Sequence, residues 1–362
     1  MFMESLQAGT PAPLARFCGN ASFCSSACKQ FADQAGEFYS GLMKRIRHLV
    51  LAGALACLFA AAERGPDAVA AEPRRLKVLT SFLPIYCFAS NVAGELADVE
   101  NLLPGGVGPH DYQFSRKDAQ KVNAADLIVV NGLQLEGWID KLIQSAASGR
   151  PKTVVEASAG LQSELIFGLP HPHRESAAEK SAAERSIRPG EQKHANPHIW
   201  LDPRLAMHAV TNILSALQKV DPANAAGYGA NAAGYLARLR TLDAELETAL
   251  APARNCAVVT YHDAFPYFAR RYGLDVVGVI EEVPEVDPSP KHLASLQRVV
   301  RQSRVKVILT EPPFSSKLAR QIGRDLQVPV AELDTLETGP LRPGAYEEGL
   351  RRNLRVLQNY LK

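Results

Sequence analysis

Three histidines and one aspartate in this sequence have the positions expected of metal ligands. His110 follows a run rich in glycine and proline, His198 stands just before a helix-start signal, and His262 and Asp334 each follow an apolar run typical of a strand. Three neutral imidazoles and one carboxylate suit Zn²⁺, which prefers tetrahedral nitrogen, oxygen and sulfur ligands. Ca²⁺ and Mg²⁺ prefer oxygen ligands. Manganese or iron would favour further carboxylates, whereas copper, nickel and cobalt stay open as alternatives.

The elements that must position these side chains alternate along the chain. Short β-rich runs separated by helical patterns predict parallel sheets with helical crossovers, and they fall into two sets of four. We therefore expect an α/β fold of two lobes, each with a four-stranded parallel sheet flanked by helices, joined by a long rigid helix. The predicted strands are Leu76–Ser81, Val99–Leu103, Asp126–Asn131, Lys152–Glu156, Cys256–Tyr261, Asp275–Ile280, Lys306–Thr310 and Val328–Leu333.

Between the two sets lies a long helical stretch. Asp202-Pro203 combines an N-cap acid with proline at the first helical position and predicts a helix that continues to about Val220. After Pro222 a second helical run rich in Ala, Leu, Arg and Glu continues to Leu250. A helix of this length spans roughly 40 Å, and a single stiff helix between two lobes predicts limited hinge motion.

The candidate ligands then meet in one place. Ligands of open parallel sheets bind beyond the carboxyl ends of the strands, so two candidates from each lobe would converge in a cleft between the lobes. Other polar residues suit structural roles. His208 and His292 lie within helical patterns, Glu136 and Trp138 suit capping and packing, and Glu311 suits a supporting or structural role beside the site.

These patterns divide the chain into four parts. We expect an N-terminal extension and signal peptide over residues 1–71, a first lobe over 72–221, a linking helix over 222–252 and a second lobe over 253–362. The first lobe carries a charged segment, 170–195, that has no apolar periodicity and predicts a solvated loop. A role of this loop in metal sensing or delivery stays open because it contains His171, His173 and His194.

The N-terminal part has the layout of an export signal over residues 43–71. A basic start at Met43 is followed by an apolar run, Leu49–Ala62, and then by small residues that suit cleavage. The apolar run is too short to span a bilayer comfortably. We expect a periplasmic protein whose start is Met43 or Met1, with lipid anchoring at Cys57 as the alternative.

Charge and cysteine content exclude some classes of protein. A net charge of +2 gives no reason to expect a nucleic acid or an anionic membrane as partner. Only Cys87 and Cys256 follow the predicted signal peptide. A periplasmic setting would permit a disulfide between them, but two buried thiols fit their apolar surroundings better.

Four phrases in the sequence resemble those of the metal-binding proteins of zinc and manganese ABC transporters. The resemblance runs from about Leu76 to Lys362, and one departure is Gln113-Phe114 where an acidic-proline pair is usual. The phrases are Leu103–Tyr112, Asn131–Trp138, Asn196–Pro203 and Tyr261–Phe268.

The resemblance implies two α/β lobes that hold a metal between them. It maps His110, His198 and His262 to three family histidines and Asp334 to the carboxylate after the last strand. Manganese-type members are expected to carry Glu at the position of His262, so this histidine indicates the zinc type. The resemblance also implies a membrane permease as partner.

We therefore expect a monomeric zinc-binding component of an importer and not an enzyme, because a shell of four protein ligands leaves no open position for a reacting water. Binding should weaken below a pH of about 6, since imidazole must lose its proton to bind metal. The alternatives are a manganese- or iron-binding member of the same family, an adhesin with a vestigial site, and a zinc hydrolase that uses Glu311 or Asp263 as general base. The H-E-x-x-H motif of many zinc hydrolases does not occur in the sequence.

Overall fold

The computed structural model describes residues 74–110, 112–146, 152–167, 195–281, 288–312 and 317–361. The predicted signal peptide, Cys57 and the three histidines of the 170–195 segment lie outside these ranges. The second of the chain's two units, Arg75–Lys362, contains all the elements described below. None of the helices in the described ranges combines the length and apolarity needed to cross a bilayer.

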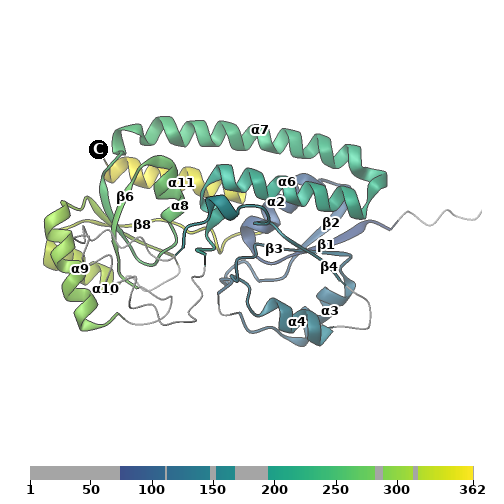
Figure 1. Ribbon diagram of the computed structural model, residues 1–362, viewed down its shortest axis with the longest axis horizontal. Coiled ribbons are helices and arrows are strands. Elements are labelled where there is room, and N and C mark those ends of the chain that lie inside the picture. Colours follow the sequence, from purple (N-terminus) through teal and green to yellow (C-terminus); the bar gives the residue numbers. More distant parts are fainter. Residues whose placement is uncertain are drawn as a thin grey trace, which may run out of the picture. The chain divides into compact units, whose positions relative to one another are not determined.

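Two parallel sheets, each of four strands, form the framework of the second unit, and Figure 1 shows helices flanking both. The first sheet has the order β2-β1-β3-β4 and the second the order β6-β5-β7-β8, so the two lobes repeat one topology. This arrangement confirms the predicted fold class. The strands are β1 (Leu76–Thr80), β2 (Ala97–Asn101), β3 (Leu127–Val130), β4 (Thr153–Glu156), β5 (Ala257–Thr260), β6 (Asp275–Val279), β7 (Val307–Thr310) and β8 (Val330–Glu332).

Three of the four central strands are buried along their whole length. β3, β5 and β7 are each a run of four buried residues, all of them apolar in β3, whereas β5 and β7 each have three apolar residues followed by a threonine. Strands covered on both faces by helices have this continuous apolar character. The helices are α2 (Leu83–Ala93), α3 (Arg116–Ala124), α4 (Ile139–Ala146), α6 (Pro203–Val220), α7 (Ala225–Leu250), α8 (Pro266–Tyr272), α9 (Pro290–Ser303), α10 (Lys317–Leu326) and α11 (Ala345–Tyr360).

One long helix, α7, links the lobes as predicted. It has 26 residues and extends past both sheets in Figure 1. It follows α6, whose first turn is capped by the Asp202 carboxylate, which accepts from the N–H of Arg204 at 2.8 Å. At 1.5 Å per residue α7 is about 39 Å long. It packs against α6, α2 and α11, which come from both sides of the junction.

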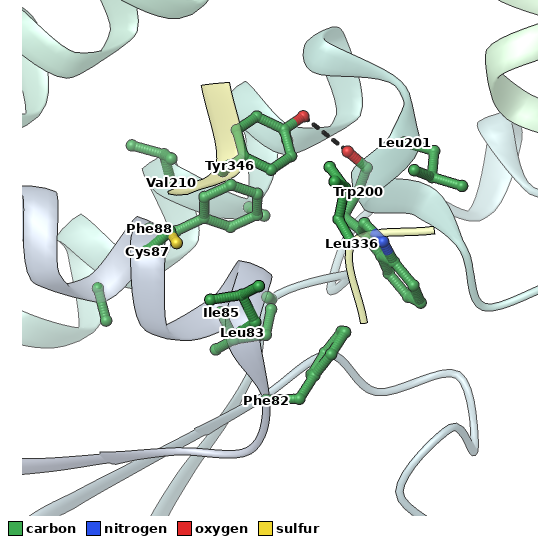
Figure 2. Close-up of a cluster of buried hydrophobic side chains, with 14 of the residues drawn as sticks. Phe82, Leu83, Ile85, Cys87, Phe88, Trp200, Leu201, Val210, Leu336 and Tyr346 are labelled. Carbon is green, nitrogen blue, oxygen red and sulfur yellow. Dashed lines mark hydrogen bonds between the residues drawn. The ribbon is translucent and has the colours of Figure 1, made fainter. Parts of the chain in front are cut away.

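A continuous apolar core lies beneath α7 and joins the lobes. The rings of Phe82 and Trp200 pack edge to face with their centroids 4.8 Å apart, and those of Phe88 and Tyr346 do so with centroids 4.9 Å apart. Figure 2 shows these rings together with the hydrogen bond in which the Tyr346 hydroxyl donates to the carbonyl of Trp200 at 2.6 Å. The Trp200 indole in turn donates to the carbonyl of Thr335 at 2.8 Å. Side chains from both halves of the sequence therefore share one core, which restricts relative motion of the lobes.

This shared core gives a testable expectation for stability. Tyr346→Phe removes the hydroxyl that bonds the buried Trp200 carbonyl, and we expect a loss of about 1–3 kcal/mol in the free energy of unfolding. Urea unfolding measures this loss, and Tyr360→Phe is the control because Tyr360 is 37% exposed. Equal stability of the two variants would show that the buried hydroxyl contributes nothing.

Candidate metal centre

His110 lies at the end of a loop that follows β2. Two contacts hold this loop: the Trp138 indole donates to the carbonyl of Pro109 at 2.8 Å, and the Gly339 N–H donates to the carbonyl of Gly105 at 2.5 Å. A Cβ at Gly105 would come within 2.3 Å of the Gly339 carbonyl oxygen, so the crossing of these loops requires glycine. The loop from the first lobe is thereby fixed against the segment that follows β8.

His198 lies in the segment that enters α6 and is 3% exposed. The Asn131 side chain donates to the carbonyl of Pro197 at 3.0 Å, and the backbone turns through the 3₁₀ helix Ile199–Leu201 directly afterwards. Trp200, in this turn, is part of the shared core. His198 is therefore fixed by packing on both sides.

His262 lies two residues beyond β5 and is 4% exposed. Its backbone N–H donates to Oε1 of Glu311 at 3.1 Å, and its Nδ1 contacts Oε2 of the same carboxylate. Glu311 directly follows β7, the neighbour of β5 in the sheet, so the topology brings the two side chains together. When the ring carries a single proton, on the Nδ1 that contacts Glu311, Nε2 is left as the atom for a metal.

Glu337 completes the cluster from the loop after β8. It is 5% exposed, and its Oε1 lies 3.4 Å from Nε2 of His110 and 3.3 Å from Nε2 of His198. Nε2 of His198 is in turn 3.2 Å from Nε2 of His262. One ligand atom from each of these four residues lies within 4.8 Å of the other three.

The three distances of 3.2–3.4 Å between these ligand atoms suit tetrahedral coordination of a metal ion. Ligand atoms 2.0–2.1 Å from zinc at tetrahedral angles would be about 3.3 Å apart. Nε2 of His110 and Oε1 of Glu337 are both buried without a hydrogen-bond partner among the described residues. Buried polar atoms normally have such partners, so these two atoms fit the role of ligands to a cation. The four residues could hold one metal ion.

Electrostatics keep two of the side chains in the form that binds a cation. Burial lowers the pKa of His198 to about 4, so its ring is neutral at pH 7. Burial by itself raises the pKa of Glu337, but the contacts with His110 and His198 outweigh it and lower the pKa below the ordinary value. Burial lowers the pKa of the His262 imidazole, but the surrounding carboxylates, Glu311 foremost, together have the larger effect and raise it to about 9. The cluster thus presents one ionised carboxylate beside a neutral imidazole.

Comparison with known proteins identifies the family. The model of the ZnuA family, described as the periplasmic component A of a zinc-uptake complex, matches residues 78–360. This chain belongs to the ZnuA family. All four clustered residues lie within the matched range, and so do all the described helices and strands apart from the first two residues of β1.

Individual relatives of this ZnuA-family chain have names that refer to several metals. The zinc-binding protein AdcA of Streptococcus pyogenes serotype M3 is 32% identical over 289 residues, which cover 78% of this chain and 56% of AdcA. The iron-binding protein YfeA of Yersinia pestis is 33% identical over 269 residues, 74% of this chain and 78% of YfeA. The structure of the SBP FpvC from Pseudomonas aeruginosa with Mn²⁺ has a TM-score of 0.66 at 31% identity and covers 80% of this chain and 98% of FpvC. The chain thus spans little more than half the length of AdcA.

The cluster of this ZnuA-family chain differs from the sequence-based expectation at its carboxylate. The structure brings His110, His198 and His262 together but places Asp334 outside the group and Glu337 within it. Oδ1 of Asp334 accepts from the backbone N–H of Leu336 at 2.8 Å, and its Oδ2 lies 3.3 Å from the Arg352 guanidinium. Asp334 therefore stabilises a turn, and this turn carries Glu337 to the cluster.

The remaining polar residues have structural contacts. Nε2 of His208 lies 2.7 Å from the carbonyl of Ala159, and Nε2 of His292 lies 2.8 Å from the carbonyl of Val279. Cys87 and Cys256 are free thiols, the first buried and the second half-buried. The carboxylate of Glu136 accepts hydrogen bonds from three groups, namely the Ser81 hydroxyl and the N–H groups of Asn131 and Gly132.

Proposed function

We propose that this ZnuA-family chain captures Zn²⁺ outside the cytoplasm and delivers it to the membrane permease of an ABC-type importer. The observation that carries this proposal is the cluster of His110, His198, His262 and Glu337, whose ligand atoms lie within 4.8 Å of one another. The ligands come from both lobes, so a bound ion would be enclosed between them. Export, a periplasmic location and a monomeric state are parts of the same proposal.

Zinc is the metal that the donor set favours. Three imidazole nitrogens and one carboxylate oxygen suit the borderline-soft Zn²⁺, whereas Mn²⁺ prefers more oxygen ligands. His262 is the decisive residue, because a carboxylate in its place would give two nitrogen and two oxygen ligands, a set better suited to Mn²⁺. The iron-binding name of YfeA and the Mn²⁺ in the FpvC structure support manganese or iron as the alternative cargo.

Binding without catalysis follows from the same geometry. Four protein ligands leave no open position at a tetrahedral ion for a reacting water. The two acids that a hydrolase could use as general base are already engaged: Glu311 contacts both the backbone and the ring of His262, and Asp263 accepts from the Asn196 amide. We infer a binding protein and not a zinc hydrolase.

Calorimetry on metal-free protein tests this function. We expect one Zn²⁺ per chain, a lower affinity for Mn²⁺ in competition, and no hydrolysis of ester or peptide substrates by the zinc-loaded protein. Elemental analysis of protein purified from the periplasm should find zinc. A preference for Mn²⁺ over Zn²⁺ would contradict the argument from His262, and zinc-dependent turnover would contradict the binding role.

A further inference from the structure

The side-chain amide of Asn196 bridges the two lobes next to the metal cluster. Its Nδ2 donates to the backbone carbonyl of Asp263 at 2.6 Å and to Oδ2 of Asp263 at 3.1 Å. Its Oδ1 accepts from the backbone N–H of His198 at 3.0 Å and lies 2.9 Å from Nδ1 of the His198 ring. Asn196 is only 9% exposed, so these partners replace water.

The network permits only one orientation of this amide. If oxygen and nitrogen were exchanged, the NH₂ group would face the backbone N–H of His198, donor against donor. The oxygen would face the backbone carbonyl oxygen of Asp263, acceptor against acceptor. Amide orientations are assigned from such networks, and here two of the four contacts, with the Asp263 carbonyl and the His198 N–H, involve backbone partners whose roles do not change with pH.

The orientation of Asn196 determines which nitrogen of His198 carries a proton. An amide oxygen can only accept, so Nδ1 of the neutral ring must be the donor. Nε2 is then the unprotonated nitrogen, and it faces Nε2 of His262. It also lies beside Oε1 of Glu337, an acceptor that by itself favours the opposite tautomer, so the contact with Asn196 acts against the contact with Glu337. In the opposite tautomer a proton on Nε2 would occupy the place of the metal.

The groups that hold Asn196 belong to the second lobe. Asp263 follows β5 by three residues, and the Tyr267 hydroxyl on α8 donates to the backbone carbonyl of Asn196 at 2.7 Å. Asn196 and His198 precede α6 and belong to the first lobe. The second lobe thus fixes a first-lobe ligand through an amide as well as supplying its own ligand, His262.

We propose that Asn196 is a positioning residue through which the second lobe sets the tautomer of His198 for metal capture. The tautomer is a property of the metal-free protein, whereas the effect on capture rests on the proposed zinc-binding function. The support of His198 differs in kind from that of His262, whose Nδ1 contacts the carboxylate of Glu311. A neutral amide orients the ring without adding a negative charge next to it.

The direct test is the tautomer of His198 in metal-free full-length protein, measured by ¹⁵N NMR of histidine-labelled samples at pH 7.5. The His198 signals are identified by their absence from a His198→Gln variant. We expect the Nδ1–H form in the wild type and a mixture containing the Nε2–H form in Asn196→Ala. Asn212→Ala is the matched control, because Asn212 also bonds two backbone carbonyls, those of Ala157 and Ala159, without contacting the cluster.

Zinc affinity gives the functional readout. Loss of a group that orients a metal-binding histidine typically weakens affinity 10–100-fold, so we expect a loss of about that size in Asn196→Ala and little change in Asn212→Ala. Asn196→Asp should keep the Nδ1–H tautomer, because a carboxylate still accepts from the ring, although its link to Asp263 is lost. If Asn196→Ala does not fold, the tautomer in Asn196→Asp decides in its place.

The outcomes separate the two proposals. If wild-type protein fails to bind zinc, the proposed function fails, while the tautomer result is unaffected. The role of Asn196 is overturned if the wild-type protein binds zinc and Asn196→Ala keeps the Nδ1–H form of His198 together with a zinc affinity within about threefold of the wild-type value. The Nε2–H form of His198 in the wild type or in Asn196→Asp would overturn it as well.

Discussion

Glu337→Gln is expected to weaken zinc binding by about a hundredfold or more, whereas Asp334→Asn should leave it within about threefold of the wild type. Glutamine has the size of glutamate but lacks the charge that makes the Glu337 oxygen a zinc ligand. Asparagine at position 334 can still accept from the N–H of Leu336. It loses only the contact with Arg352, a partly exposed ion pair of the kind that contributes about 0–1 kcal/mol.

The two variants form a matched pair, because each replaces an acid by its amide in the same loop. Competition against a zinc chelator measures the affinities, and thermal melting of the metal-free proteins checks that both fold. The reverse result, a large loss in Asp334→Asn and none in Glu337→Gln, would return the fourth ligand to Asp334. It would also show that the loop rearranges when metal binds.

The sequence alone could not show which of these two acids joins the cluster, because this depends on packing against a helix later in the chain. Leu336 has a positive φ of 61°, and a Cβ at Gly349 of α11 would lie 2.2 Å from its side chain. The Leu336 side chain therefore packs directly against Gly349 of α11, and this contact directs the next residue, Glu337, toward the cluster. One local signal was present: Asp often accepts from an N–H two residues later in a turn. That signal favours Asp334 as a turn residue.

The histidines and the strand positions were predictable for a different reason. Burial of β3, β5 and β7 on both faces leaves continuous apolar runs in the sequence, and a ligand just beyond such a run lies at the binding edge of the sheet. His262 satisfies this rule. The ends of helices were harder to predict from the sequence. The helical pattern in the sequence already starts at Leu135, but α4 begins at Ile139, because the Glu136 carboxylate accepts from the N–H groups of Asn131 and Gly132 and holds a turn there.

The supporting residues were the least visible in the sequence. In the sequence, Asn196 stands out only as part of a family phrase, and Glu311 only as a residue beside the site. Their roles depend on contacts across 67 and 49 positions of sequence, with Asp263 and His262 respectively. No local pattern reports such contacts. The topology explains only the second, since β5 and β7 are neighbours in the sheet.

His262→Gln should reduce zinc affinity further than the loss of any supporting group, by about a thousandfold, since the loss of a supporting group alone typically costs 10–100-fold. Glutamine can still donate a hydrogen bond to the buried Glu311 carboxylate, so the change removes a ligand without leaving that charge unpaired. His292→Gln is the control, because His292 lies on α9 of the same lobe, outside the cluster.

Calorimetry and chelator competition on both variants measure this loss, and circular dichroism confirms that the fold is retained. The physical reason for the expected effect is that a tetrahedral shell reduced to three protein ligands admits water, which exchanges and binds more weakly than a fixed imidazole. Such an open position is also the arrangement found in catalytic zinc sites. Unchanged zinc affinity in His262→Gln would mean that the second lobe contributes no imidazole to the ion, and enclosure of the metal between the lobes would then have no basis.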